Sequence, residues 1–188
     1  TNSIFAGANT RLEIARTIVE ENAGVGIQTF TGAVVKIQGS VIRNHSLAGL
    51  LIRGGSVEIK NSILETFGDK RYAYYWGGGG TLVSDYNNIR VADGANVAGG
   101  DTRAAARFLI DWQASTSFSN DVSSVGYDAE FASPFALDFH LKSAFGRYDP
   151  VAGNFVTNDT ETSRLIDLGD PASGYANEPT PNGSRINI

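Results

Sequence analysis

The sequence predicts an all-β protein: a right-handed parallel β-helix with one short α-helix and an irregular C-terminal cap. Three observations predict it: a repeat, a two-residue alternation inside each copy, and glycine-rich turns. Copies begin at Leu12, Val35, Val57 and Leu82, spaced by 23, 22 and 25 residues. Each opens with the apolar–polar–apolar pattern of a half-buried strand. A period in the low twenties made of strands and turns is typical of a solenoid, whose coils bury their apolar faces against one another.

The repeat over residues 12–89 predicts which side chains face the core. Stacked coils pair equivalent strands in parallel, so side chains at the same position of each copy form columns. We expect two inward columns and one outward column of alternating charge, namely Leu12–Val35–Val57–Leu82, Ile14–Ile37–Ile59 and Glu13–Lys36–Glu58.

A second short strand precedes three of the copies, at 25–27, 50–52 and 72–74. Aligning these strands by their first residues predicts that Tyr72 and Tyr74 face inward. The following pair, Tyr75 and Trp76, is then expected to face outward, in line with Gln28 and Arg53. This coil is therefore expected to present aromatic rings to solvent.

The repeat stops near Asn88, which predicts two regions. Residues 1–89 form the coils, and residues 90–188 form a helix-containing, loop-rich cap that packs on the last coil. No polar element covers the first coil, so we expect either further coils before Thr1 or an end-to-end contact with another molecule.

One helix is expected in the cap, over residues 103–113, with Asp101 or Thr102 as its N-cap. Its apolar face, which includes Trp112, should close the end of the core. Short strands are expected farther on, at 131–141, Val156 and Leu165–Ile166.

Composition argues against several functions. The 188-residue chain has a formal net charge of −5 and no Lys/Arg cluster, which argues against a nucleic-acid partner. No apolar run reaches the roughly 18 residues of a membrane span. Cysteine is absent, which excludes thiol catalysis and fits an exported bacterial protein. The two histidines, His45 and His140, lie near no Gly-x-Ser-x-Gly elbow, which argues against a serine hydrolase.

A series of segments carries a family resemblance. In order, they are Ser84-Asp-Tyr-Asn-Asn-Ile, Leu109-Ile-Asp-Trp-Gln-Ala, Asp138-Phe-His-Leu-Lys-Ser, Leu165-Ile-Asp-Leu-Gly-Asp-Pro-Ala-Ser, Asn177-Glu-Pro and Pro181-Asn-Gly-Ser-Arg-Ile-Asn. They resemble the C-terminal region of bacterial right-handed parallel β-helix repeat proteins, which have a pectate-lyase-like fold. The resemblance implies a secreted or cell-surface protein, but no single activity, because such folds host lyases, hydrolases, adhesins and stalks.

Polysaccharide lyases of this class use a Lys or Arg base beside acidic residues that hold calcium. The matching residues for a lyase are Lys60, Lys70 and Arg71. A glycoside hydrolase needs two carboxylates at a defined separation, for which the candidates are Glu65 with Asp69 or Asp85. These residues form no motif, so no catalytic residue is assigned.

Carbohydrate binding without catalysis has more support, because aromatic rings pack on the apolar faces of sugars while polar neighbours bond the hydroxyls. The candidate residues are Arg53, Asp69, Tyr75 and Trp76. Oxygen-bearing side chains in the tail suit calcium, with Asp167 and Asp170 as candidate ligands, although no cofactor is required.

We therefore expect a β-helix segment of a larger secreted or cell-surface bacterial protein, acting as a structural or interaction module that binds polysaccharide. The alternative is a fragment of a polysaccharide lyase or glycoside hydrolase. An outward Lys or Arg beside clustered acids in a groove would favour the alternative.

Overall fold

A computed structural model of the chain describes residues 2–117, 119–176, 178 and 183–188. The chain forms two compact units, Thr1–Gly126 and Tyr127–Ile188, and each is described by itself. The sequence placed the boundary after residue 89, where the repeat stops. The first unit runs further because two more strands, a helix and the segment after them extend a sheet and close the core.

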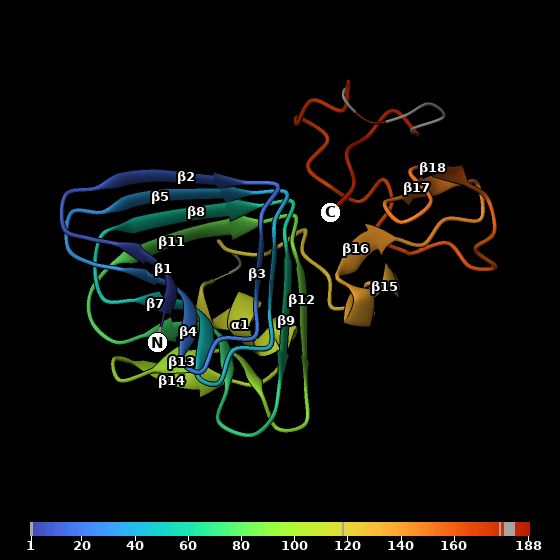
Figure 1. The fold of residues 1–188 in the computed structure, drawn as a ribbon. Coiled ribbons are helices and arrows are strands. Elements are labelled where there is room, and N and C mark those ends of the chain that lie inside the picture. The colour runs from blue at the N-terminus through green and yellow to red at the C-terminus, as the bar shows by residue number, and fades with distance from the viewer. Residues whose placement is uncertain (1, 118, 177, 179–182) are drawn as a thin grey trace. The chain divides into compact units, whose positions relative to one another are not determined.

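The first unit is a parallel β-solenoid of about four turns with three strands in each turn (Figure 1). The predicted all-β fold class is therefore confirmed. The strands of the four turns are β1 (Asn2–Ala6), β2 (Arg11–Ala15) and β3 (Ile18–Glu20); β4 (Val25–Thr29), β5 (Val34–Gln38) and β6 (Val41–Arg43); β7 (Ala48–Ile52), β8 (Ser56–Lys60) and β9 (Ile63–Phe67); and β10 (Tyr72–Trp76), β11 (Thr81–Asp85) and β12 (Asn88–Ala92).

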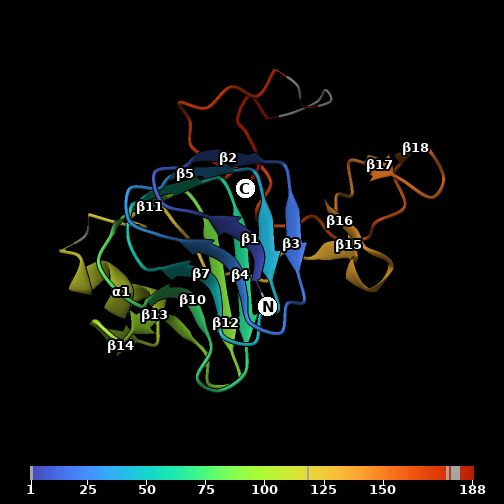
Figure 2. The same cartoon turned by 60° about the vertical axis from the view of Figure 1, so that its left-hand side comes forward.

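Equivalent strands of successive turns lie side by side in three sheets (Figure 2). The first sheet has six strands in the order β1-β4-β7-β10-β13-β14, where β13 is Asn96–Gly100 and β14 is Arg103–Ala106. The second sheet has the order β11-β8-β5-β2, and the third has β12-β9-β6-β3. Every pair is parallel except β13 with β14, which is antiparallel.

The predicted columns of the second sheet are confirmed. Leu12, Val35, Val57 and Leu82 are in register, and the last three are almost fully buried while Leu12 packs partly buried against the core. The isoleucine column continues from Ile59 into the buried Ser84. On the outer face, Lys36 Nζ lies 3.5 Å from Glu58 Oε2. Both side chains are largely exposed, so this ion pair contributes about 0.2–1 kcal/mol and mainly favours the register.

The corner between the second and third sheets is a feature that the sequence pattern did not predict, since two strands per turn were expected. One residue with positive φ makes each corner: Arg16 (50°), Gly39 (58°), Asn61 (49°) and Tyr86 (54°). A left-handed residue turns the chain sharply, but it costs energy for any residue except glycine. Three of these four corners therefore carry no glycine or proline signal that could have marked them.

A ladder of hydrogen bonds offsets this cost by linking the corners of successive turns. In each step, the backbone N–H after one corner donates to a side-chain oxygen of the next turn. The four steps are Thr17 N to Ser40 Oγ (3.2 Å), Ser40 N to Ser62 Oγ (3.2 Å), Ser62 N to Asn87 Oδ1 (3.0 Å) and Asn87 N to Ser124 Oγ (2.9 Å). Backbone donors inside the corner are thus satisfied without water.

The register of the first sheet corrects the expected directions of its aromatic side chains. Tyr74 pairs with Leu50 and is buried, as predicted. Trp76 pairs with Ile52 and is only 5% exposed, so its predicted outward direction is wrong. Tyr72, predicted to face inward, packs instead against Tyr75 on the outer face. The prediction failed because the first residue of each strand departs from regular alternation: Val25, Ala48 and Tyr72 are in register and pack together outside the main core cluster.

The helix α1 (Leu109–Ser115) is shorter than predicted and begins later. The alanine-rich segment Arg103–Ala106, expected to be helical, forms β14 on the open edge of β13. Edge hydrogen bonds outweigh intrinsic helix propensity here. The predicted role of Trp112 is confirmed, because its ring lies 5.5 Å from that of Trp76 and closes the core.

A buried polar cluster completes this end of the solenoid. The Asp121 carboxylate is fully buried and accepts hydrogen bonds from Trp112 Nε1 (2.8 Å), Ser84 Oγ (2.7 Å) and Ser124 Oγ (2.7 Å). Burial raises the pKa of Asp121, and these hydrogen bonds partly oppose that shift. The Tyr74 hydroxyl shares a 2.8 Å hydrogen bond with Ser84 Oγ, which ties the aromatic layer to the cluster.

The second unit contains two antiparallel strand pairs. β15 (Phe131–Ser133) pairs with β16 (Asp138–Leu141), and a short 3-10 helix, η1 (Pro134–Ala136), joins them. β17 (Arg147–Asp149) pairs with β18 (Asn154–Val156). The strands predicted near 131–141 and Val156 are thus present in part, whereas Leu165–Ile166 lies in a turn. Among the residues that the structure describes in both units, no helix is long and apolar enough to cross a membrane.

Candidate functional site

The outer face of the first sheet carries a row of side chains that crosses four parallel strands. The row runs Phe5, Gln28, Leu51 and Tyr75, with one residue on each of β1, β4, β7 and β10. Phe5 is 59% exposed, and its ring lies 4.7 Å from that of Phe30. Three steps of about 4.8 Å between neighbouring strands separate Phe5 from Tyr75, which places them about 14 Å apart.

Two tyrosines form one end of this row. The rings of Tyr72 and Tyr75 meet edge to face with centroids 5.0 Å apart, and both side chains are partly exposed. Gly99 of β13 is in register with Tyr75, and a Cβ there would lie 2.7 Å from Cε1 of Tyr72. The missing side chain at Gly99 therefore makes room for the Tyr72 ring on the outer face.

Polar groups of both charges surround the Tyr75 hydroxyl. It donates a 2.7 Å hydrogen bond to Oδ1 of Asp101, and Asp101 is exposed. This hydrogen bond raises the pKa of Tyr75, whereas the positive charge of nearby Arg53 lowers it. The site thus places an aromatic ring, a carboxylate and an exposed guanidinium close together. The ring can pack on the apolar face of a sugar, and the two charged groups can bond its hydroxyls.

The structure separates the other two residues predicted for carbohydrate binding from Tyr75 and Arg53. Trp76 points into the core, where Cζ of Arg103 lies 4.5 Å from its ring centroid. Asp69 is exposed in the turn before β10, beside Gly94, whereas Arg53 follows β7. The length of a strand therefore lies between Asp69 and the Tyr75 hydroxyl. Asp101, which sequence reasoning missed, takes the place predicted for a carboxylate.

The candidates for lyase chemistry lie at two different corners. Lys60 ends β8 of the second sheet and is in register with Asp85 of β11. Lys70 and Arg71 lie in the turn between β9 and β10, beyond the third sheet. The fold therefore does not assemble these three cations around one point.

Glu65, the predicted glycosidase carboxylate, belongs to an ion-pair ladder on the third sheet. Register places Glu20, Arg43, Glu65 and Arg90 side by side. Arg43 lies 3.3 Å from Glu20 and 3.4 Å from Glu65, and Arg90 lies 3.7 Å from Glu65. Glu65 is only 3% exposed and stays between two cations, an arrangement typical of a structural ladder. Asp85 lies in a different sheet from Glu65.

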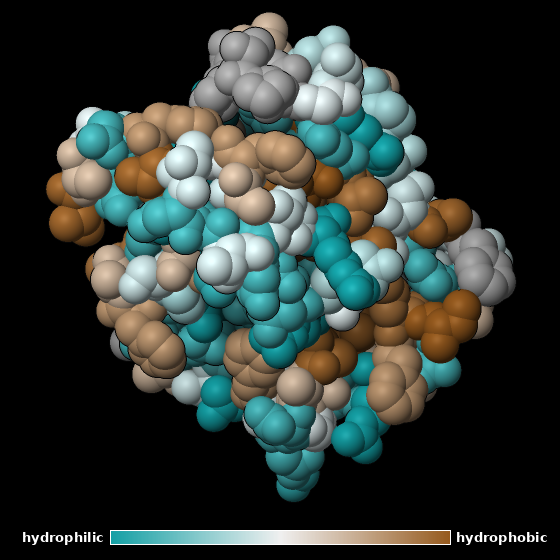
Figure 3. Space-filling model, turned by 90° about the vertical axis from the view of Figure 1, so that its right-hand side faces the viewer, coloured by the Kyte–Doolittle hydropathy of each residue, from teal (hydrophilic) through white to brown (hydrophobic). Residues whose placement is uncertain are grey.

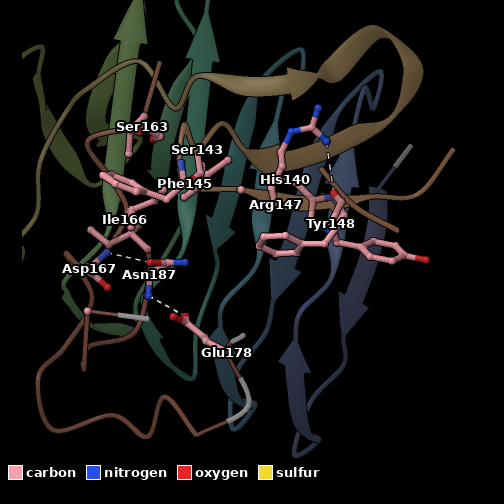
Figure 4. Close-up of a pocket in the computed structure, with 16 residues that line it drawn as sticks. His140, Ser143, Phe145, Arg147, Tyr148, Ser163, Ile166, Asp167, Glu178 and Asn187 are labelled. Atoms are coloured by element: carbon pink, nitrogen blue, oxygen red, sulfur yellow. Dashed lines mark hydrogen bonds between the residues drawn. The ribbon is translucent and has the colours of Figure 1, made fainter. Parts of the chain in front are cut away.

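The second unit contains a pocket of about 790 Å³ that no sequence pattern predicted. Aromatic rings of Phe145, Tyr148 and Phe155 line it, together with Ile166 and several polar side chains (Figure 4). Its residues come from the end of β16, the β17–β18 hairpin and the terminal loops. The space-filling view shows apolar and polar side chains mixed in small groups on the face of the molecule that it draws (Figure 3).

One wall of the pocket is held by a charged network. Arg147 donates to Asp138 Oδ2 (3.1 Å) and to Asp159 Oδ2 (2.8 Å). His140 Nδ1 lies 2.6 Å from Asp138 Oδ1. The carboxylate of Asp138 therefore orients both the imidazole and the guanidinium at the pocket rim.

The predicted calcium ligands have different environments. Asp167 lines the pocket, and its backbone N–H donates to Asn187 Oδ1 (2.8 Å). Asp170 instead caps a turn, with its Oδ1 accepting from the backbone N–H of Ala172 (2.9 Å). Within the described parts of the chain, no three His, Asp or Glu side chains group around a possible metal position. Calcium binding remains a prediction.

Comparison with known proteins identified no relatives. No family model, no curated protein sequence and no solved structure matched this chain.

Proposed function

We propose that the solenoid is a non-catalytic interaction module of a larger secreted or cell-surface protein, and that it binds polysaccharide on the outer face of its first sheet. The observation that supports this most is that aromatic rings stand at both ends of the row, with Phe5 exposed and Tyr75 partly exposed and bonded to Asp101. The two residues between them, Gln28 and Leu51, are almost fully buried. Phe5 and Phe30 supply apolar surface at the other end.

The shape of this surface suits an extended chain. Parallel strands place Phe5 and Tyr75 on one line about 14 Å long, a span that fits a short oligosaccharide lying across the strands. Rings at the two ends can pack on sugar faces, while Arg53 offers hydrogen-bond donors and the Asp101 carboxylate offers acceptors. A catalytic reading has less support, because the cations considered for a lyase lie at separate corners.

Affinity electrophoresis of the full chain in native gels tests this proposal. The gels contain soluble polygalacturonate, as an acidic polysaccharide, or xylan, as a neutral one. We expect at least one polysaccharide to retard the wild type, and Tyr75→Ala to weaken the binding by about tenfold, as for loss of an aromatic anchor. Tyr75→Phe keeps the ring and should retain most of the affinity.

Val83→Ala is the matched control, because Val83 is 57% exposed on the outer face of β11 in the second sheet. Unchanged retardation of this variant would locate the binding on the first sheet. Equal loss in both variants, or full retention in Tyr75→Ala, would refute the proposed site. Release of reducing ends or of unsaturated sugars during incubation would favour the enzymatic alternative.

A further inference from the structure

The pocket of the second unit has a chemical character that points to a class of ligand. Figure 4 shows the rings of Phe145 and Tyr148 together with the side chains of Asp167 and Glu178 around it. The apolar lining can accommodate a hydrophobic body. Aromatic faces and carboxylates both attract positive charge, so this pocket favours cationic ligands more than a purely apolar cavity would.

The charges around the pocket are unbalanced toward the negative. Of the described lining residues, only Arg147 carries a permanent positive charge, and it is already held by Asp138 and Asp159. Asp167 and Glu178 are lining carboxylates outside that network. They lie close enough that the charge of Asp167 contributes to raising the pKa of Glu178, after the larger effect of burial.

One carboxylate oxygen lacks a donor. Oδ1 of Asp167 is buried from solvent and has no hydrogen-bond partner among the described residues. A buried acceptor left unpaired is unfavourable, so turning the Asp167 carboxylate toward a donor in the pocket would remove that penalty. Asn187 bonds to both of these residues. Its side-chain Oδ1 accepts from the backbone N–H of Asp167, and its own backbone N–H donates to Glu178 Oε1 (2.9 Å).

We propose that this pocket binds an organic cation, a primary ammonium group attached to an apolar or aromatic body, with the ammonium on Asp167 and the body against the Phe145 and Tyr148 rings. An ammonium offers three donors and suits a corner with an unpaired carboxylate oxygen. A bare metal ion fits less well, since hard cations require six or more oxygen ligands. The site is independent of the solenoid face and of the polysaccharide proposal.

Three probes of one shape test the proposal: benzylamine, benzyl alcohol and benzoate, which are cationic, neutral and anionic at neutral pH. Each is titrated into the isotopically labelled full chain and followed by amide NMR signals. We expect saturable shifts at Asp167 and Asn187 with benzylamine, at least tenfold weaker binding of the alcohol, and none of benzoate. Asp167→Asn should weaken benzylamine binding by about tenfold or more.

Glu161→Gln is the control for this variant, because it removes an exposed carboxylate of the same unit that does not line the pocket. Glu178→Gln is a second test in case Asp167→Asn disturbs folding, and dispersed spectra establish that each variant is folded. Equal affinity for the amine and the alcohol would overturn the proposal in favour of an apolar pocket. Preference for benzoate would assign an anion site to Arg147 and His140, and no shift at tens of millimolar benzylamine would reject the site.

Discussion

Asp121 should contribute more to the stability of the solenoid than any exposed carboxylate. Its side chain is fully buried and accepts from Trp112, Ser84 and Ser124 at 2.7–2.8 Å. Asp121→Ala would leave the indole N–H of Trp112 as a buried donor without an acceptor. The serine hydroxyls can rotate toward other acceptors, but the indole N–H cannot.

The expected loss follows from these contacts. The unpaired indole donor costs about 1–3 kcal/mol, and the lost hydrogen bonds to a charged acceptor add about 1.5–3 kcal/mol. Relief from burying the carboxylate offsets part of this, so we expect a net loss of about 2–4 kcal/mol, at the lower end of the cost of breaking a buried charged network. Asp121→Asn retains one acceptor for Trp112 and should lose less than half as much.

Urea unfolding followed by tryptophan fluorescence measures this loss directly. The chain has two tryptophans, Trp76 and Trp112, and both lie in the solenoid core, so the signal reports on that unit. Glu13→Ala, an exposed carboxylate on β2, is the control and should change stability by less than about 0.5 kcal/mol. A loss below about 1 kcal/mol in Asp121→Ala would show that the cluster is not what closes the core.

The same carboxylate predicts a dependence on pH. Burial raises the pKa of Asp121 in the folded state above its unfolded value. The folded state therefore binds more protons in that interval, and stability from this group falls as pH rises from about 3.9 through the raised pKa. Asp121→Asn should remove this slope, so a slope that persists unchanged in the variant would contradict the assignment.

Three further changes test the fold. Val35→Asp buries a charge in the inner column and should abolish cooperative unfolding, whereas Val83→Asp on the outer face should be tolerated, as circular dichroism can establish. His45 is buried with both ring nitrogens bonded to backbone groups, and burial lowers its pKa, so stability should fall as pH drops below about 6.5 and His45→Gln should flatten that profile. Gly26→Ala would place a Cβ 2.6 Å from His45 Nε2 and should lower the melting temperature, whereas Gly79→Ala meets no atom within 4 Å and should not.

The repeat predicted the columns of the second sheet because period-2 alternation survives there in every turn. The same reasoning failed for the first sheet, because Ala73 and Tyr74 are adjacent in sequence and both lie in the core. That break in alternation turned Tyr72 outward, whereas Trp76 faces inward because β10 extends past Tyr74 and alternation continues to its end. Asp101 joined Tyr75 only because β13 continues the sheet beyond the last recognisable copy. A register across strands is a tertiary property that local pattern does not encode.

The two proposed sites differ in how a sequence could reveal them. In the solenoid, an inward side chain must fit the layers above and below it, whereas an outward position such as Tyr75 can vary without disturbing the core. Aromatic residues at outward positions are therefore a readable signal once the register is known. The pocket of the second unit has no such signal, because residues as distant as His140 and Asn187 meet there without a period. Its unpaired Asp167 oxygen is visible only when the surrounding chain is in place, so function in that unit has to be argued from the structure.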